Sequence, residues 1–177
     1  MFIIVGLGNP GKEYECTRHN VGFLAVDALR TSLHGSEWKL KQKFLCDIST
    51  AEVHQRKILL VKPGTFMNRS GECVKKLVDF YQLDPSKQIL VVVDDIDIPL
   101  GTHRLRSSGG PGTHNGMKSI TEHIGEEFPR LRIGIGPKPE SGDLAAWVLS
   151  RPSAAERDAL ETAFAEVTTV IEAIVEK

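Results

Sequence analysis

One histidine and one aspartate are the residues best suited to acid–base chemistry in this sequence. His19 lies between Arg18 and Asn20, in the loop that leaves the first predicted strand. An imidazole titrates near neutral pH, so His19 is a candidate general base. Asp94 follows the most apolar predicted strand, where a carboxylate can accept a hydrogen bond from the imidazole and fix its tautomer. The structural alternative is a histidine that braces its loop and an aspartate that forms a turn.

Side-chain amides form a second group of candidates. Four asparagines lie beside turns rich in glycine, proline or serine: Asn9, Asn20, Asn68 and Asn115. Asparagine favours turns for structural reasons alone. Gathered at strand ends, however, such amides would supply neutral donors and acceptors to a carbonyl, an amide or a water. Phe66 and Met67 would add an apolar wall beside Asn68.

Positive charge is local rather than global. The net charge is −1, which argues against a protein that coats nucleic acid through bulk charge. Arg104 and Arg106 alternate along a predicted strand and therefore share one face. With Lys118 and Arg132 they would contact phosphates and add affinity without sequence reading. The alternative is a solvated strand face.

Other site types have weaker support. The segment GLGNPG (6–11) fits a dinucleotide-binding pattern, but Pro10 and a polar run follow it, and the apolar helix begins about ten residues later. Cys16 lies three residues before His19, so a Cys–His pair stays open, although nothing marks the thiol as activated. The six histidines show no H-x-x-x-H spacing, which argues against a metal site.

The predicted elements bring these candidates to one place. Apolar runs predict strands over 2–7, 44–53, 57–61, 88–93, 102–106 and 130–135, and helical spacing predicts helices from about 20, over Ser70–Tyr81, 115–125 and 154–175. Alternating strands and helices predict an α/β fold, a single domain over 1–177 with a twisted, mixed, partly parallel sheet flanked by helices. Ligands bind outside the carboxyl ends of such strands, so the polar clusters after Leu7, after Val93 and around Asn115 are expected to meet there.

Composition indicates a globular cytoplasmic protein. The chain has 177 residues, 41% hydrophobic and 25% charged. Apolar stretches such as 89–93 are far below the ~20 residues that span a bilayer, and the start does not resemble a signal peptide. Three widely spaced cysteines, Cys16, Cys46 and Cys73, are expected to be reduced thiols.

Read together, six segments resemble bacterial peptidyl-tRNA hydrolases and follow that family's order. They are GLGNPGKEY (6–14), TRHNVG (17–22), KPGTFMNRSG (62–71), VVDDIDIPLG (92–101), GGPGTHNGMKSI (109–120) and RLRIGIG (130–136). Each segment is short, but the combination is specific. The sequence departs from the family in its glycine loop, where Pro111 replaces a frequent histidine and Thr113 a frequent glycine.

The resemblance implies an activity. It implies hydrolysis of the ester bond between an N-blocked peptide and tRNA, which recycles the tRNA. The enzyme is expected to be a monomer that uses no metal or organic cofactor and needs no protein partner. A relative that only binds RNA, as an assembly factor, is a second reading. A peptidase or amidase that uses Cys16 or a metal is a third.

The resemblance also implies roles for individual residues. His19 matches the catalytic base, Asp94 the carboxylate that holds this base ready, and Asn9 the amide that distinguishes N-blocked peptidyl-tRNA from free aminoacyl-tRNA. The positions that match contacts to tRNA or peptide are Tyr14, Phe66, Asn68 and Asn115, and Met67 joins them as part of the apolar wall. Arg104 and Arg106 stand where the family carries basic residues proposed to grip phosphates.

Overall fold

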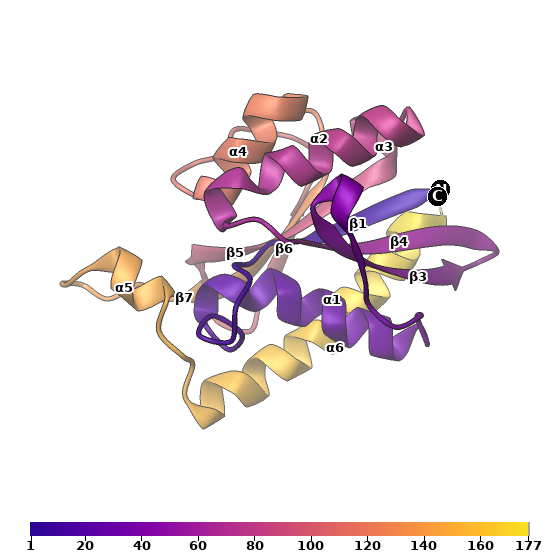
Figure 1. The fold of residues 1–177 in the computed structure, drawn as a ribbon. Coiled ribbons are helices and arrows are strands. Elements are labelled where there is room, and N and C mark those ends of the chain that lie inside the picture. Colours follow the sequence, from indigo (N-terminus) through magenta and orange to yellow (C-terminus); the bar gives the residue numbers. More distant parts are fainter. Residues whose placement is uncertain (177) are drawn as a thin grey trace.

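A computed structural model describes residues 1–176, in which seven strands form one mixed sheet (Figure 1). The strands are β1 (Phe2–Gly6), β2 (Lys39–Lys41), β3 (Cys46–Val53), β4 (Arg56–Pro63), β5 (Ile89–Pro99), β6 (His103–Arg106) and β7 (Arg130–Gly136). Their order across the sheet is β2-β3-β4-β1-β5-β7-β6. The four strands β4, β1, β5 and β7 are parallel, and β2, β3 and β6 pair antiparallel at the two edges.

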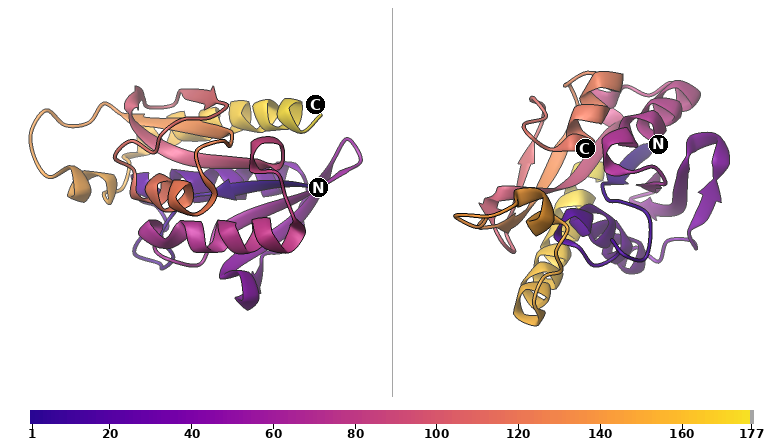
Figure 2. Two further views of the ribbon diagram at one scale, coloured as in Figure 1. Left: turned by 90° about the horizontal axis from the view of Figure 1, so that it is seen from above. Right: turned by 60° about the vertical axis from the view of Figure 1, so that its left-hand side comes forward.

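Helices cover both faces of the sheet (Figures 1 and 2). α1 (Val21–Ser32) and α6 (Ala154–Glu176) lie on one face, and α2 (Ser70–Tyr81) and α4 (Asn115–Ile124) lie on the other. The short elements are α3 (Pro85–Gln88), α5 (Leu144–Val148) and the 3-10 turns η1 (Arg18–Asn20), η2 (Gln42–Phe44) and η3 (Met67–Arg69). None of the described helices is both long and apolar enough to cross a bilayer.

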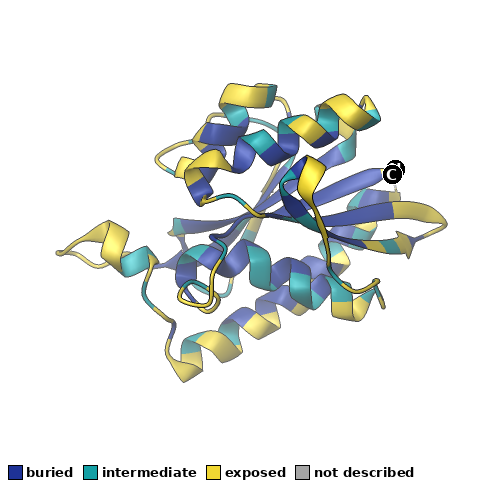
Figure 3. Ribbon diagram, viewed as in Figure 1, coloured by how far each residue is buried: buried dark blue, intermediate teal, exposed yellow. Residues whose placement is uncertain are grey.

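Side-chain alternation along the central strands builds two cores. In β1, Ile4 packs with α1 and α6, whereas Ile3 and Val5 pack on the opposite face with α2 and α4. Because helices cover both faces of the sheet, β1 is buried along its whole length (Figure 3). A parallel strand in this position has a continuous apolar sequence. The predicted fold class is confirmed: an α/β fold with a mixed, partly parallel sheet flanked by helices.

Several element boundaries differ from the prediction. The strand predicted from 44 starts at Cys46, because Phe44 belongs to η2 and Leu45 takes a left-handed φ of 58°. β5 runs on to Pro99, so Asp94 lies inside a strand instead of forming a turn. The elements that were not predicted are β2, whose three residues are all exposed, the short helices α3 and α5, and the 3-10 turns.

A close approach of backbone to backbone places the start of α1 over the sheet. A β-carbon at Gly22 would lie 2.4 Å from the Leu7 nitrogen and 2.5 Å from the Val92 carbonyl oxygen, and one at Gly6 would lie 2.3 Å from the Gly22 oxygen. Only glycine allows this contact. Because η1 directly precedes α1, His19 is held at the carboxyl ends of β1 and β5 in a 3-10 turn, where the sequence suggested a loop.

Candidate active site

A cavity of about 740 Å³ opens at the carboxyl ends of the parallel strands. Its walls come from the segment after β1 with η1, the segment after β4, β5, the end of β6, the glycine loop with the start of α4, β7, and α5. The lining includes Asn9, His19, Phe66, Met67, Asn68, Asp94, Arg106 and Asn115. The predicted meeting of the polar clusters after Leu7, after Val93 and around Asn115 at this edge is therefore confirmed.

His19 and Asp94 are in direct contact although 75 positions separate them. The imidazole Nδ1 lies 2.9 Å from Oδ2 and 3.1 Å from Oδ1 of the carboxylate. Burial acts to lower the pKa of His19, but the charge and the hydrogen bond of Asp94 raise it, and the net pKa lies above its usual value. With Nδ1–H donating to Asp94, the neutral ring carries its lone pair on Nε2.

Asp94 is buried, with 5% of its surface exposed. Burial alone would raise the pKa of this carboxyl, yet His114 and His19 together hold it far below its usual range. The carboxylate is therefore ionised at neutral pH.

His114 is the second partner of Asp94 and was not among the candidates predicted from the sequence. Its Nε2 lies 2.8 Å from Asp94 Oδ1. Its Nδ1 accepts hydrogen bonds from the backbone N–H groups of Gly116 and Met117, at 3.1 and 3.2 Å, and so caps α4. An accepting Nδ1 leaves the ring proton on Nε2, which donates to Asp94. The sequence did contain a signal for this role. His114 directly precedes the helix predicted from Asn115, and that helix was expected to begin at this edge of the sheet.

Asn9 is held in one orientation by its neighbours. Its Oδ1 accepts from the Met67 backbone N–H at 2.8 Å, and its own backbone exchanges two hydrogen bonds of 2.9 Å with the Asn20 side chain. Since Oδ1 is engaged, Nδ2 is the donor that Asn9 can offer to a ligand. Asn20 is buried and acts as the support for Asn9.

The remaining predicted contact residues form the rim and the floor. Phe66 is 55% exposed and meets Tyr14 edge to face at 6.3 Å between ring centroids. Tyr14 itself is not among the lining residues. Asn68 and Asn115 are exposed at the rim, whereas Met67 is buried and belongs to the core.

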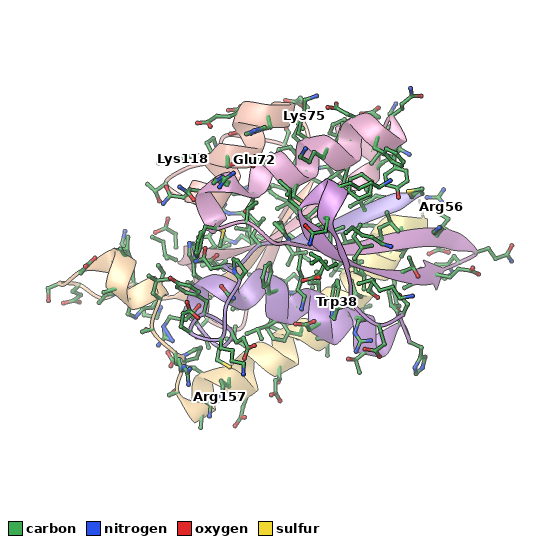
Figure 4. The ribbon with its side chains drawn as sticks, viewed as in Figure 1. Trp38, Arg56, Glu72, Lys75, Lys118 and Arg157 are labelled. Carbon is green, nitrogen blue, oxygen red and sulfur yellow. The ribbon has the colours of Figure 1, made fainter. Side chains whose placement is uncertain are left out.

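Only part of the predicted basic group reaches the cavity. Arg106 and Arg132 line it, but Arg104 and Lys118 do not. Arg104 and Arg106 are two residues apart on β6 and pair with Arg132 and Arg130 of β7, so all four lie on one face of the sheet, as predicted for Arg104 and Arg106. Arg104 nevertheless lies outside the cavity. Lys118 projects from α4 in the layer above the sheet (Figure 4).

Arg132 and Arg130, on β7, both have interaction partners within the protein. Arg132 forms an ion pair with Asp95, so much of its charge is already compensated. Arg130 is buried and donates to the carbonyls of Gly109, Gly110 and Glu126, which ties the glycine loop to β7.

One group within residues 1–176 has the composition of a metal site. Ligand atoms of His19, Asp94 and His114 lie within 4.8 Å of one another. His19 Nδ1 and His114 Nε2 already contact the Asp94 carboxylate at 2.9 and 2.8 Å. An ion bound to these nitrogens at ~2.0–2.1 Å would have to displace the protons that they share with the carboxylate. The thiols are elsewhere: Cys16 is exposed outside the lining, and Cys46 and Cys73 are buried in the core.

Comparison with known proteins extends over nearly the whole chain. The model of the family described as peptidyl-tRNA hydrolase matches residues 3–177. The chain belongs to the peptidyl-tRNA hydrolase family. A peptidyl-tRNA hydrolase of Alkaliphilus oremlandii is 55% identical over 152 residues, which cover 85% of this chain and 80% of the relative. One from Chloroflexus aggregans is 44% identical over 176 residues, covering 99% and 93%.

Solved structures agree with the sequence comparison. The crystal structure of peptidyl-tRNA hydrolase from Acinetobacter baumannii superposes with a TM-score of 0.93 at 37% identity, covering 99% of this chain and 89% of that one. The chain is thus an enzyme of the hydrolase class, and peptidyl-tRNA hydrolysis is the activity that its family supports.

The contact between His114 and Asp94 predicts a stability effect. His114→Asn keeps a short acceptor for the start of α4 but removes one donor from the buried carboxylate. We expect the free energy of unfolding to fall by about 1–3 kcal/mol, measured by urea denaturation at pH 7. His54→Asn is the matched control, because His54 is exposed at a φ of 48°, a conformation that asparagine tolerates. Equal stabilities for both variants would contradict this assignment.

Proposed function

We propose that the chain hydrolyses the ester between an N-blocked peptide and tRNA with a water activated by His19. The observation that carries the proposal is the hydrogen bond of 2.9 Å between His19 Nδ1 and the buried Asp94, in a cavity rimmed by amides. It leaves Nε2 as the basic nitrogen. Asp94 is already ionised and in place, so no rearrangement is needed when the ring gains its proton.

The reaction balances with one proton carrier. His19 Nε2 takes a proton from water as the water oxygen bonds to the ester carbonyl carbon. Asp94 stabilises the imidazolium and keeps the ring oriented. When the tetrahedral intermediate collapses, the bond to the terminal ribose oxygen breaks and the imidazolium returns its proton to that oxygen. A positioned base of this kind contributes about 10²- to 10⁴-fold to the rate.

Selection of N-blocked substrates is assigned to Asn9. Its Oδ1 is engaged by the Met67 backbone, so Nδ2 would donate to the carbonyl that blocks the peptide's amino group. A free aminoacyl-tRNA offers an ammonium there, which would leave this donor without a partner. An unmatched buried polar group gives strong discrimination. Asn68 and Asn115, at the rim, would position the peptide or the water.

The tRNA end is assigned to the basic side of the cavity. Arg106 lines the cavity and is exposed, so it would contact a phosphate near the terminal nucleotides, with Arg104 further along β6. The Tyr14–Phe66 pair would face the nucleotide or the peptide at the rim. The proposal further holds that residues 1–177 act as one cytoplasmic domain, as a monomer, without a metal, an organic cofactor or a protein partner.

The central test uses two substrates. The parent enzyme should release N-acetyl-aminoacyl groups from tRNA and leave the unblocked aminoacyl-tRNA intact. His19→Ala should lower kcat on the blocked substrate by about 10²- to 10⁴-fold, because the base is lost. It also removes one donor from the buried Asp94, so its free energy of unfolding should fall by about 1–3 kcal/mol, and kcat is measured under conditions where the urea titration shows the variant to be folded. His54→Asn serves as the control variant. Near-parental turnover by His19→Ala would refute the assignment.

The pH profile should report His19. The base acts when neutral, so kcat/KM should fall as pH drops through a pKa above the usual value of 6.5. Asp94→Asn removes the charge that raises this pKa and leaves the effect of burial, which lowers it. The inflection should therefore move to lower pH, and the plateau should fall by at least about 10²-fold. An unmoved inflection would show that another group titrates.

Metal removal should leave the reaction unchanged. Because His19 and Asp94 supply the base and its partner, dialysis against EDTA is expected to keep kcat on N-acetyl-aminoacyl-tRNA within about twofold. Added Zn²⁺ should inhibit if it binds at the His19–Asp94–His114 group, because a bound ion occupies the nitrogens. A loss of activity on chelation that Zn²⁺ restores would contradict this expectation.

A further inference from the structure

Arg18 is a buried cation beside the proposed base, and the reaction above does not use it. Its side chain is 9% exposed, and Nη2 donates to both carboxylate oxygens of Glu156 at 2.9 and 3.0 Å. The guanidinium carbon lies 5.0 Å from the centroid of the Trp147 ring. The Arg18 backbone N–H also donates to the Ser150 carbonyl at 3.0 Å. One residue therefore contacts three points between 147 and 156.

These contacts hold the segment that forms one wall of the cavity. β7 ends at Gly136 and α6 begins at Ala154, and α5 lies between them at one end of the molecule (Figure 1). The segment is largely exposed (Figure 3), yet Leu144, Val148 and Leu149 line the cavity and give it an apolar side. Leu144 and Leu149 are 39% and 41% exposed, so they offer apolar surface to a ligand.

The partner of Arg18 is itself fixed. Glu156 Oε2 accepts from the Ser153 backbone N–H at 2.7 Å, and the Glu156 N–H donates to Ser153 Oγ at 3.3 Å, a capping arrangement at the start of α6. The Ser153 N–H lowers the pKa of Glu156, and the charge of Arg18 lowers it further, so the ion pair is present at neutral pH. Arg18 thus joins η1 to a rigid helix end.

The stacking contact explains the choice of arginine. Nε and Nη1 of Arg18 are buried and have no hydrogen-bond partner within residues 1–176, so the face of Trp147 supplies the remaining compensation for this charge. Arginine stacks on the ring through its planar face while Nη2 donates to the carboxylate, whereas lysine has no planar group to stack.

We propose that Arg18 is a positioning residue that fixes α5 relative to the turn carrying His19, and that the apolar wall so placed recognises apolar side chains of the peptide. The proposal rests on the proposed function for its substrate, because it assigns the peptide to the α5 side of the same cavity. Arg106 and Arg132, on β6 and β7, line the other side of the cavity, which is assigned to the tRNA. Arg18 acts through α5 and does not touch the reacting atoms.

Two variants disturb this link in different ways. Arg18→Lys keeps the charge but loses the planar group that stacks on Trp147. Glu156→Gln keeps the cap, which accepts either residue, and removes the charge that faces Arg18. Asp158→Asn is the matched control: it removes one exposed carboxylate from the same turn of α6, next to Arg157 at the helix end seen in Figure 4.

The kinetic readout compares a small with a large apolar residue. N-acetyl-phenylalanyl-tRNA and N-acetyl-glycyl-tRNA are each assayed with every variant, so differences between the two tRNAs cancel. We expect KM for the phenylalanyl substrate to rise about 5-fold in both test variants, with kcat and the glycyl KM changed less than about twofold. Asp158→Asn should match the parent. An equal loss of kcat on both substrates would overturn the proposal, because Arg18 would then act through His19.

A second readout does not depend on catalysis. Hydrogen exchange of the Trp147 and Leu149 amides, which donate to Asp143 and Ala145, should quicken in Arg18→Lys and Glu156→Gln but not in Asp158→Asn. Unchanged exchange in both test variants would overturn the proposal. If the parent enzyme failed to cleave blocked substrates, the proposed function would fall instead, while exchange would still test the contact between Arg18 and α5.

Discussion

The site depends on one buried carboxylate that must not lose its donors. Asp94 is almost fully buried and is stabilised as an anion by His19 and His114. Removing one donor from a buried polar group typically costs about 1–3 kcal/mol, so the fold and the orientation of both rings are linked. The carboxylate fixes which nitrogen of His19 carries the proton. The helix cap does the same for His114, and each ring therefore has one defined task.

Bringing these groups together is the work of the backbone. His19 reaches Asp94 because Gly6 and Gly22 let α1 approach β1 without side chains between them. The same loop is tied by Asn20, whose amide holds Asn9 in place through two hydrogen bonds. Proposed catalysis and proposed substrate selection thus share one support. A change that loosened η1 would disturb both.

The remaining walls of the cavity are less constrained by this centre. The glycine loop is held by Arg130, and the α5 wall is held by Arg18, each through a buried guanidinium with partners in a different element. The family model matches residues 3–177, a range that includes both of these walls. Both walls therefore depend on arginine contacts that are separate from the hydrogen bonds of Asp94.

The sequence by itself determined the fold class and the candidates His19 and Asp94, because apolar periodicity and the polar ends of strands are local patterns. Motif resemblance added the family. Only the tertiary structure decided that His114 shares Asp94, that Arg104 stays outside the cavity, and that Arg18 reaches α6. Those facts depend on contacts between residues up to 138 positions apart. The periodicity of apolar residues along the sequence does not predict such contacts, because they depend on strand register and on how the helices pack in the folded chain.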